Sequence, residues 1–412
     1  MPNSKSQNTT AKNIPRAKAL EILKKQLRPV PPTQTSVTDC SAQVAAKTLY
    51  SGISLPEYDR SAMDGFAVLS SDTENASAKE PAILKFSGEI RPSGHTPLKN
   101  TRGNAVRLLT GGIVPEGADA VIPFERVTIR ENDIEISSPV KKGEFIRKCG
   151  SDIMRGDIIV TESSIISPCT AALLAYAGIC TIPVRRSPSI SVLAVGNELC
   201  DPARENECGL IPADNLILLK SLCKNIGVNN ISISPCANSP EHISTAIDNH
   251  SHSDLIITTG GTGPGNRDFV FNSVISAGGK TLFKGLAMHP AKSIFACSLD
   301  RCTVIGLPGP PGAVNLAFHT IIKPIINILS GISEISPTTT ARLKDNVTGS
   351  ADREKLRPCL ISEEEGMLLA DPLTSGNLSQ RQVMNLCNGI IVLPAGCGQL
   401  ESGEKVSVIK CN

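Results

Sequence analysis

Three short apolar runs in the second half of the chain are each followed at once by a turn rich in glycine or proline. The runs are 190–195, 255–258 and 303–307, and the turns that follow them span 195–198, 258–265 and 307–312. Continuous apolar runs of this length, bounded by turn residues, are typical of buried parallel strands. Open α/β sheets bind ligands beyond the carboxyl ends of their strands. The pattern therefore predicts one cleft formed by the three turns.

Helical periodicity alternates with these runs. Helices are expected at 215–225, from Ser239 onward, at 268–277 and at 313–329, with a further strand at 228–234. Alternation of this kind implies right-handed crossovers and a parallel sheet.

The rest of the chain has a different texture. Helices are expected at 14–27, 39–49 and 167–177. Short β-like runs separated by Gly and Pro turns fill 53–142, which is typical of a small all-β module. Strands reappear after residue 336, most clearly at 390–393 and 405–409.

Composition excludes several classes of protein. The 41 Lys+Arg balance 39 Asp+Glu, which argues against a nucleic-acid protein with a basic face. Aromatic residues make up 3% and Trp is absent, so the cores are expected to be aliphatic. The 14 Cys include no CxxC pair, and we interpret most of them as buried thiols in a reducing, cytoplasmic compartment. The sequence shows neither a long apolar run nor a signal-peptide core, so no membrane segment is expected.

The loop at 258–265, TTGGTGPG, follows a predicted strand and precedes a predicted helix. In that position its backbone N–H groups can bind an anion, although a plain flexible turn has the same composition. The residues expected to bind the anion are Gly260, Gly261, Thr262 and Gly263.

Two acids stand at predicted strand ends near this loop. Asp268 begins a helix, where a carboxylate can act as a cap or can hold Mg²⁺ together with phosphate oxygens. Glu198 is either a solvated loop acid or part of a metal or pterin-amide site. Lys284 and Lys292 are either solvated or neutralise a phosphate or an oxyanion. The residues alone leave these alternatives open.

The turn at 307–312 contains two consecutive prolines between glycines. Proline limits φ, and glycine permits close approach of a ligand or a second backbone. The turn is therefore either a tight strand-to-helix connection or a preformed wall for a planar ligand.

Residues 61–68, SAMDGFAV, resemble the signature segment of the molybdopterin molybdenumtransferase (MoeA-type) family, which is related to the E domain of gephyrin. Similar blocks follow in the family's order: Thr110 to Gly112 with 115–121 and Glu125, then 150–153, 195–199, 260–268, 307–309, 375–379 and 391–394. The resemblance is collinear over roughly residues 14–410, which makes it more specific than any single block.

This resemblance implies a multidomain fold of α/β plus β type. The expected parts are a helical and extended linker or dimerisation domain (14–52 and 143–184), an inserted small β-rich domain (53–142), a doubly wound α/β molybdopterin-binding domain (185–333) and a C-terminal β-barrel-like domain (334–412).

The resemblance also implies a reaction and its partners. Molybdate is inserted into adenylylated molybdopterin, and molybdenum cofactor and AMP are released. The expected assembly is a homodimer whose cleft is shared between subunits, and a molybdopterin adenylyltransferase is a further expected partner. The residues carried over from the family blocks are Asp64, Thr110, Asp152, Glu198 and Asp268 for catalysis, with Mg²⁺ at Glu198 and Asp268, and Lys284, Pro308, Pro311, Ser375 and Ser379 for binding. Lys292 is added to the binding residues from its position near the anion loop.

Three positions depart from the family pattern. The central loop reads Gly-Gly-Thr-Gly-Pro-Gly, which looks more like the related molybdopterin adenylyltransferases. His289 stands where the family often has Lys or Arg, and Asn197 replaces a frequent Asp. An altered oxyanion site or metal choice is therefore an open alternative.

Two competing functions follow from the same residues. One is transfer of adenylate from ATP to molybdopterin, which the loop suggests and the segment 61–68 opposes. The other is a non-catalytic binding or scaffold protein with the same fold. The sequence does not distinguish molybdate from tungstate.

Overall fold

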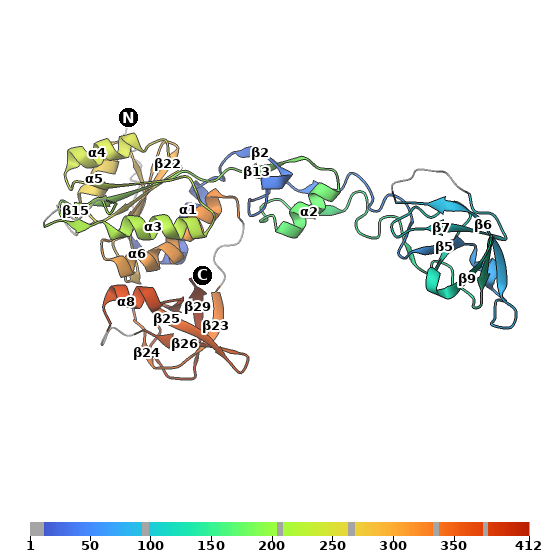
Figure 1. Cartoon of the computed structure of the whole chain (residues 1–412). Helices are drawn as coiled ribbons and strands as arrows, with labels where there is room; N and C mark the ends of the chain where they lie inside the picture. Colours follow the sequence, from blue (N-terminus) through green and yellow to red (C-terminus); the bar gives the residue numbers. More distant parts are fainter. Residues whose placement is uncertain are drawn as a thin grey trace, which may run out of the picture. The chain divides into compact units, whose positions relative to one another are not determined.

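The structure is a computed structural model that describes residues 12–92, 99–203, 209–262, 268–332, 338–373 and 378–411. The chain divides into two compact units (Figure 1). The first comprises Met1–Lys47, Ser163–Ser167 and Thr181–Asn412, and the second comprises Thr48–Glu162 and Pro168–Cys180. The four domain boundaries expected from the sequence are finer than this division and stay a prediction.

A seven-stranded sheet forms the centre of the first unit, in the order β1-β19-β21-β22-β18-β14-β17. Its strands are β1 (Lys12–Ile14), β14 (Ile190–Val195), β17 (Ile231–Cys236), β18 (Leu255–Thr259), β19 (Lys280–Leu286), β21 (Phe295–Leu299) and β22 (Cys302–Leu307). The neighbours β17, β14, β18 and β22 are parallel, which confirms the parallel arrangement predicted for them. The strand β21 is antiparallel to both β19 and β22, so the sheet as a whole is mixed.

The three apolar runs are confirmed as adjacent strands. Ala194 pairs with Thr259, and Thr259 pairs with Leu307, so the carboxyl ends of β14, β18 and β22 lie at one edge of the sheet. The strand β14 lies between β17, which follows it in the chain, and β18, which comes next. The order of strands therefore reverses between β14 and β18, and this is where open α/β sheets bind ligands.

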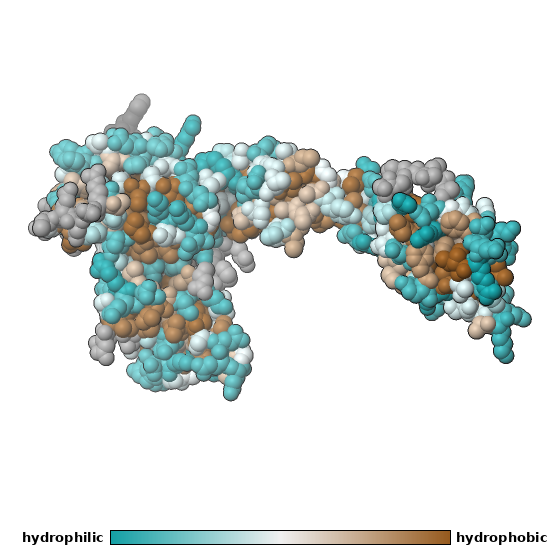
Figure 2. Space-filling view, in the orientation of Figure 1, coloured by the Kyte–Doolittle hydropathy of each residue, from teal (hydrophilic) through white to brown (hydrophobic). Residues whose placement is uncertain are grey.

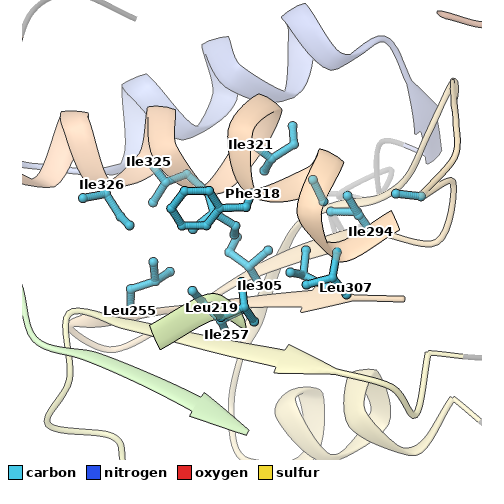
Figure 3. Close-up of a cluster of buried hydrophobic side chains, with 14 of the residues drawn as sticks. Leu219, Leu255, Ile257, Ile294, Ile305, Leu307, Phe318, Ile321, Ile325 and Ile326 are labelled. Carbon is cyan, nitrogen blue, oxygen red and sulfur yellow. The ribbon is translucent and has the colours of Figure 1, made fainter. Parts of the chain in front are cut away.

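Helices cover both faces of this sheet. Their bounds are α1 (Arg16–Gln26), α3 (Asp214–Asn225), α4 (Pro240–Asn249), α5 (Phe269–Ser276), α6 (Pro311–Ala317), the π-helical η4 (Phe318–Ile322) and α7 (Lys323–Leu329). Val192 and Ile257 belong to a core cluster shared with α1, α3, α6 and α7, whereas Leu193 and Ile256 belong to a second cluster shared with α4 and α5. Alternate strand residues thus face opposite cores, as the period of a strand requires. Figure 3 shows Phe318 lying over the strand side chains of the first cluster.

The helical segment Pro311–Leu329 is 19 residues long and has a mean hydropathy of 1.3 over its most apolar window. By length and composition alone it is long enough to cross a membrane, but 83% of that window is buried inside the protein. A helix that is covered on most sides is apolar on most sides. Its apolar residues therefore serve the core seen in Figure 3.

Two predictions for the N-terminal part are wrong in detail. The helix expected from residue 14 begins at Arg16, because Lys12–Ile14 pair with β19 as a parallel strand. The helix expected over 39–49 is absent: a 3-10 turn, η1 (Val37–Asp39), is followed by bends in which Val44 and Ala45 form β-bridges to distant segments. These tertiary backbone contacts override the local pattern.

A closed barrel occupies the C-terminal region of the first unit. Its strands are β23 (Thr338–Leu343), β25 (Glu354–Glu364), β26 (Met367–Pro372), β27 (Gly389–Leu393) and β29 (Lys405–Lys410). The pairing of β25 with β27 closes the ring that runs through β26, β23 and β29. The short strand β20 (Met288–His289) adds to β25 and ties the barrel to the sheet region. Helix α8 (Gln380–Leu386) packs against α6 and β25.

The second unit contains a six-stranded sheet in the order β8-β5-β7-β6-β10-β9. Its strands are β5 (Gly65–Val68), β6 (Ala82–Ile90), β7 (Asn104–Leu108), β8 (Ala120–Pro123), β9 (Val127–Arg130) and β10 (Asp133–Ile136). The β-rich character predicted for this region is confirmed. The signature segment supplies β5, which lies between β8 and β7.

The remaining elements are short. They are α2 (Pro168–Tyr176), η2 (Ser70–Thr73), η3 (Phe124–Arg126), and the two-stranded pairs β2 (Pro32–Ser36) with β13 (Thr181–Arg185), β3 (Leu49–Tyr50) with β12 (Ile158–Val160), β4 (Arg60–Ser61) with β11 (Ile146–Arg147), β15 (Leu199–Cys200) with β16 (Ile211–Pro212), and β24 (Val347–Thr348) with β28 (Gln399–Leu400).

Candidate active site

A cavity of about 210 Å³ opens at the carboxyl ends of β14 and β18. We call it the strand-end cavity. Val195, Glu198, Thr259, Gly260 and Pro311 are among its lining residues. It lies at the reversal of strand order, where the predicted cleft was expected. All three turns that were predicted to converge contribute residues to the strand-end cavity.

Glycine is required in the turn after β18 because the backbone passes close to β14. Gly260 and Gly261 have φ of +84° and +63°, a region that residues with a side chain rarely adopt. A Cβ on Gly260 would overlap the carbonyl oxygen of Val195, and one on Gly261 would lie 2.7 Å from a methyl of Val270. Thr262, the next residue, is buried, and its hydroxyl donates to the carbonyl of Leu307 at 3.3 Å. Gly263, the last of the four residues predicted to bind the anion, lies outside the described residues.

Asn215 holds two of the turns together. Its Nδ2 donates to Thr259 Oγ1 at 3.0 Å and to the carbonyl of Gly309 at 2.8 Å. Thr259 Oγ1 in turn donates to the carbonyl of Pro308 at 3.0 Å. Because both acceptors are fixed, the orientation of the amide is fixed as well. Asn215 lines the strand-end cavity and had not been singled out from the sequence.

Glu198 lies where the sequence placed it, just after β14, with an exposed side chain. Its carboxylate folds back over Gly196: a Cβ at that position would lie 2.7 Å from Oε1 and 2.9 Å from Oε2. The absence of a side chain at Gly196 therefore lets the carboxylate lie against the backbone. Glu198 borders the strand-end cavity and can accept hydrogen bonds or a cation there.

Asp268 and Lys284 form an ion pair, with Lys284 Nζ 2.8 Å from Asp268 Oδ2. The Asp268 side chain is 9% exposed, and its Oδ1 is buried without a partner among the described residues. Lys284 Nζ also lies 3.6 Å from the centroid of the Phe271 ring, which is a cation–π contact. Lys284 thus fixes the Asp268 side chain just before α5, and Asp268 Oδ1 is left without a described partner.

A second and larger cavity, of about 650 Å³, lies between the sheet region and the barrel. Its lining includes His289, Lys292, Pro308, Arg357 and Gln380, and no acidic side chain among the described residues lines it. Neither Lys292 nor Arg357 is paired with a carboxylate in the described part of the chain. We call this larger space the cation-lined cavity. Arg357 was missed in the sequence because its strand position carries no motif.

The proline-rich turn separates the two cavities. Pro308 and Pro310 line the cation-lined cavity, whereas Gly309 and Pro311 line the strand-end cavity. Pro311 is the first residue of α6, where its fixed φ suits the helix. The turn therefore lies between two cavities, and its role as a wall for a planar ligand stays a prediction.

Helix α8 of the barrel reaches both cavities. Gln380 lines the cation-lined cavity, and Arg381 lines the strand-end cavity, where it pairs with Asp214 at 2.6 Å. Ser379, a predicted binding residue, caps this helix: its Oγ accepts from the backbone N–H of Gln382 at 3.2 Å. Ser375 lies outside the described residues.

In the second unit, Asp64 and Thr110 form one hydrogen-bonded pair. Asp64 Oδ1 accepts from Thr110 N at 2.6 Å and from Thr110 Oγ1 at 2.7 Å. These two bonds, the hydroxyl first, together with the charge of Arg107, lower the pKa of Asp64. The next residue, Gly65, lies so close to β8 that a Cβ on it would overlap the carbonyl of Ile122. Glycine is therefore required directly after Asp64.

Asp152 lies in the same unit and forms a bidentate pair with Arg147, with distances of 2.8 and 3.0 Å. A neighbouring pair joins Lys148 Nζ to Asp59 at 2.7 Å. Asp64, Thr110 and Asp152 thus lie in one unit and the strand-end residues in the other.

Comparisons with known proteins agree with this arrangement. Family models match in order along the chain: the MoeA N-terminal region (domain I and II) at residues 14–178, a probable molybdopterin binding domain at 191–327, and the MoeA C-terminal region (domain IV) at 340–411. The third match contains the closed barrel, and the second contains the strand-end turns.

Relatives cover almost the whole length. A molybdopterin molybdenumtransferase of Haemophilus influenzae is 30% identical over 396 residues, covering 93% of this chain and 96% of its own. One of Bacillus subtilis is 29% identical over 361 residues, covering 86% and 84%. The crystal structure of a molybdopterin biosynthesis MoeA protein from Pyrococcus horikosii superposes with a TM-score of 0.86 at 27% identity, covering 97% of this chain and 99% of that one. The chain therefore belongs to the MoeA family of molybdopterin molybdenumtransferases.

Proposed function

We propose that this protein inserts molybdate into adenylylated molybdopterin and releases AMP and molybdenum cofactor. The observation that supports this most directly is the pair of cavities on either side of the proline-rich turn. One lies at strand ends suited to a phosphorylated heterocycle, and the other is lined by cations without acids. A reaction that joins an oxyanion to an anionic pterin needs two such adjoining spaces.

The cation-lined cavity is the proposed molybdate site. Lys292 and Arg357 carry positive charges that no carboxylate of the described residues neutralises. Both side chains are exposed at the cavity, and cations without a carboxylate partner can bind an anion there. Lys284, by contrast, is already paired with Asp268 and is assigned to that acid rather than to molybdate.

The strand-end cavity is the proposed site for the adenylylated pterin. The backbone N–H of Gly261 suits a phosphate oxygen, whereas that of Gly260 already donates to the carbonyl of Leu307 at 3.2 Å. Glu198 offers acceptor oxygens to the donor groups of a pterin ring or to a metal. Asp214 and Arg381 close one side of the cavity through their ion pair.

We propose Asp268 and Glu198 as carboxylate ligands that a magnesium ion would use, each by itself. Asp268 Oδ1 is a buried carboxylate oxygen without a described partner, beside Lys284 of β19, and Glu198 is a separate carboxylate at the strand-end cavity. Mg²⁺ uses one or two carboxylates and completes its shell with water and phosphate oxygens. When bound there, the ion would neutralise the charge of the adenylate phosphates. Lys284 holds the Asp268 carboxylate in position through its ion pair.

We propose further that the protein is a homodimer in which Asp64 and Thr110 of one subunit act with the strand-end residues of its partner. A patch of exposed apolar side chains in the second unit supports the dimer. Tyr50 and Ile158 are cross-strand partners and are 57% and 54% exposed, and Tyr176 of α2, which packs against β12, is 56% exposed. Apolar surface is visible over the region of α2 in Figure 2. Exposed patches of this kind mark interaction sites.

A molybdopterin adenylyltransferase is the proposed supplier of the substrate, since the adenylylated pterin has to be made before it can be used. Adenylyl transfer by this chain itself has less support, because the matching relatives are molybdenumtransferases along their full length.

The test is a reaction of purified protein with adenylylated molybdopterin, with and without molybdate and in the absence of ATP. We expect AMP release that depends on molybdate. Glu198→Gln and Asp64→Asn should abolish it while circular dichroism stays unchanged. AMP release only when ATP is added would support adenylyl transfer, and normal turnover by both variants would overturn the site assignment.

A further inference from the structure

His289 differs from the other basic residues of the cation-lined cavity in its chemistry. Lysine and arginine keep their charge throughout the physiological pH range, whereas the imidazole of histidine gains or loses its charge between about pH 5 and pH 8. Among the described lining residues, His289 is the one with this property. The total positive charge facing the cavity therefore depends on pH through one side chain.

The position of His289 is fixed by strand pairing. It ends β20, where it pairs with Lys355 of β25, and it is exposed at the cavity. Arg357 lies two residues further along β25, and Lys292 follows in the chain segment after β20. The parts of α6 and α8 that line the cavity contribute no charged side chain among the described residues.

The nearby acids are already neutralised. Arg353 pairs with Asp352 at 2.6 Å, and Arg16 pairs with Glu354 at 2.6 Å. Lys355 donates to the carbonyl of Thr348 at 3.1 Å and has no carboxylate partner among the described residues. His289 thus faces mostly positive charge.

We propose that His289 takes up a proton from solvent when an oxyanion enters the cation-lined cavity, so that affinity for molybdate falls as pH rises through neutrality. This inference rests on the proposed function, because it takes molybdate as the occupant. A dianion beside the imidazole stabilises its charged form, and that form adds a third cation to Lys292 and Arg357.

The environment without an anion favours the neutral ring. Partial desolvation by neighbouring atoms, and then the charges of Arg357, Lys355 and Arg353, lower the pKa of His289 below its ordinary value. A bound dianion opposes these effects and raises the pKa. Below the pKa of the free protein, His289 is charged in both states and affinity is highest. Above the pKa of the complex it is neutral in both, and affinity reaches its lower level.

The experiment measures the dissociation constant of molybdate by calorimetry on the full-length protein at several values between about pH 5.5 and pH 8.5. We expect the wild-type affinity to fall by up to about tenfold per pH unit within the window between the two pKa values. His289→Lys should bind tightly at every pH, and His289→Gln should bind weakly at every pH. His252→Gln, in the turn before β18 at the opposite edge of the sheet, should behave as wild type.

A second readout is proton uptake. The wild type should take up a fraction of a proton on binding near neutral pH, measured from the dependence of binding heat on the buffer, and His289→Lys should take up none. A parallel pH dependence in wild type and His289→Lys would overturn the role of His289 and leave the molybdate site intact. Failure of all variants to bind molybdate at any pH would instead overturn the proposed site itself.

Discussion

Lys284 Nζ lies 2.8 Å from Asp268 Oδ2, and the Asp268 side chain is 9% exposed. Replacing Lys284 by Met would leave a nearly buried carboxylate without its cation. We expect this change to lower the free energy of unfolding by about 2 kcal/mol, less than for a fully buried pair, because Lys284 is partly exposed. Urea unfolding of Lys284→Met, Asp268→Asn and the double variant measures the coupling.

The double variant should lose less stability than the sum of the two single variants. Lys292→Met is the matched control, since Lys292 has no carboxylate partner in the described part of the chain, and it should unfold as the wild type does. Additive effects would show that the pair does not stabilise the α/β region.

Gly196→Ala should damage activity more than stability. The added Cβ would lie 2.7 Å from Glu198 Oε1, and a flexible side chain can move away at little cost. The carboxylate then leaves its place at the end of β14. We expect a fall in molybdate-dependent AMP release with an unfolding midpoint close to that of the wild type. If the variant kept its activity, the reaction would not require the Glu198 carboxylate to lie against Gly196.

Gly260→Ala and Gly227→Ala form a matched pair, because both glycines have φ of +84°. Alanine in this conformation costs about 1–3 kcal/mol at either site. At Gly260 the Cβ would also overlap the carbonyl of Val195, whereas nothing lies within 4 Å of a Cβ at Gly227. Chemical unfolding should therefore show a larger loss for Gly260→Ala, and equal losses would contradict the close approach of the two strand-end turns.

Thr110→Val should raise the pKa of Asp64. The hydroxyl of Thr110 is the largest of the influences that lower it, and its backbone N–H is the second. The variant keeps the N–H bond and loses the hydroxyl bond. Because the folded-state pKa is depressed, the small stabilisation from Asp64 is present above the unfolded pKa and is lost as pH falls through the folded one. An NMR titration of the Asp64 carboxyl carbon measures the change, and an unaltered pKa would rule out this dependence.

Mixed dimers test whether the active site is shared. Asp64→Asn and Glu198→Gln homodimers should each be inactive. If the two residues act across subunits, unfolding and refolding an equal mixture should restore about one quarter of wild-type activity, since half of the dimers are mixed and each holds one intact site. Refolding either variant alone is the control. No recovery in a mixture shown to contain mixed dimers would place both residues in a site within one chain.

The local chemistry of the sequence was sufficient for the parallel strands and for the glycine turns at their ends. Continuous burial of β14, β18 and β22 leaves an apolar run, and a turn that must adopt positive φ requires glycine. The ordered blocks of the family resemblance then connected Asp64 with Glu198, which periodicity alone did not. The helix predicted over 39–49 was wrong because contacts with distant segments, the β-bridges to Ile165 and Val184, decide its conformation.

Tertiary structure alone decided which side chains share a space. Arg357 lies on a barrel strand and His289 on a short strand that pairs beside it, and no spacing in the sequence brings them together. Asn215 fixes two turns by long-range hydrogen bonds. Lys284 resembles a free anion-binding lysine in the sequence, yet in the fold its charge is already matched by Asp268. Composition and pattern act along the chain, whereas charge pairing and cavity lining depend on distances between segments far apart in it.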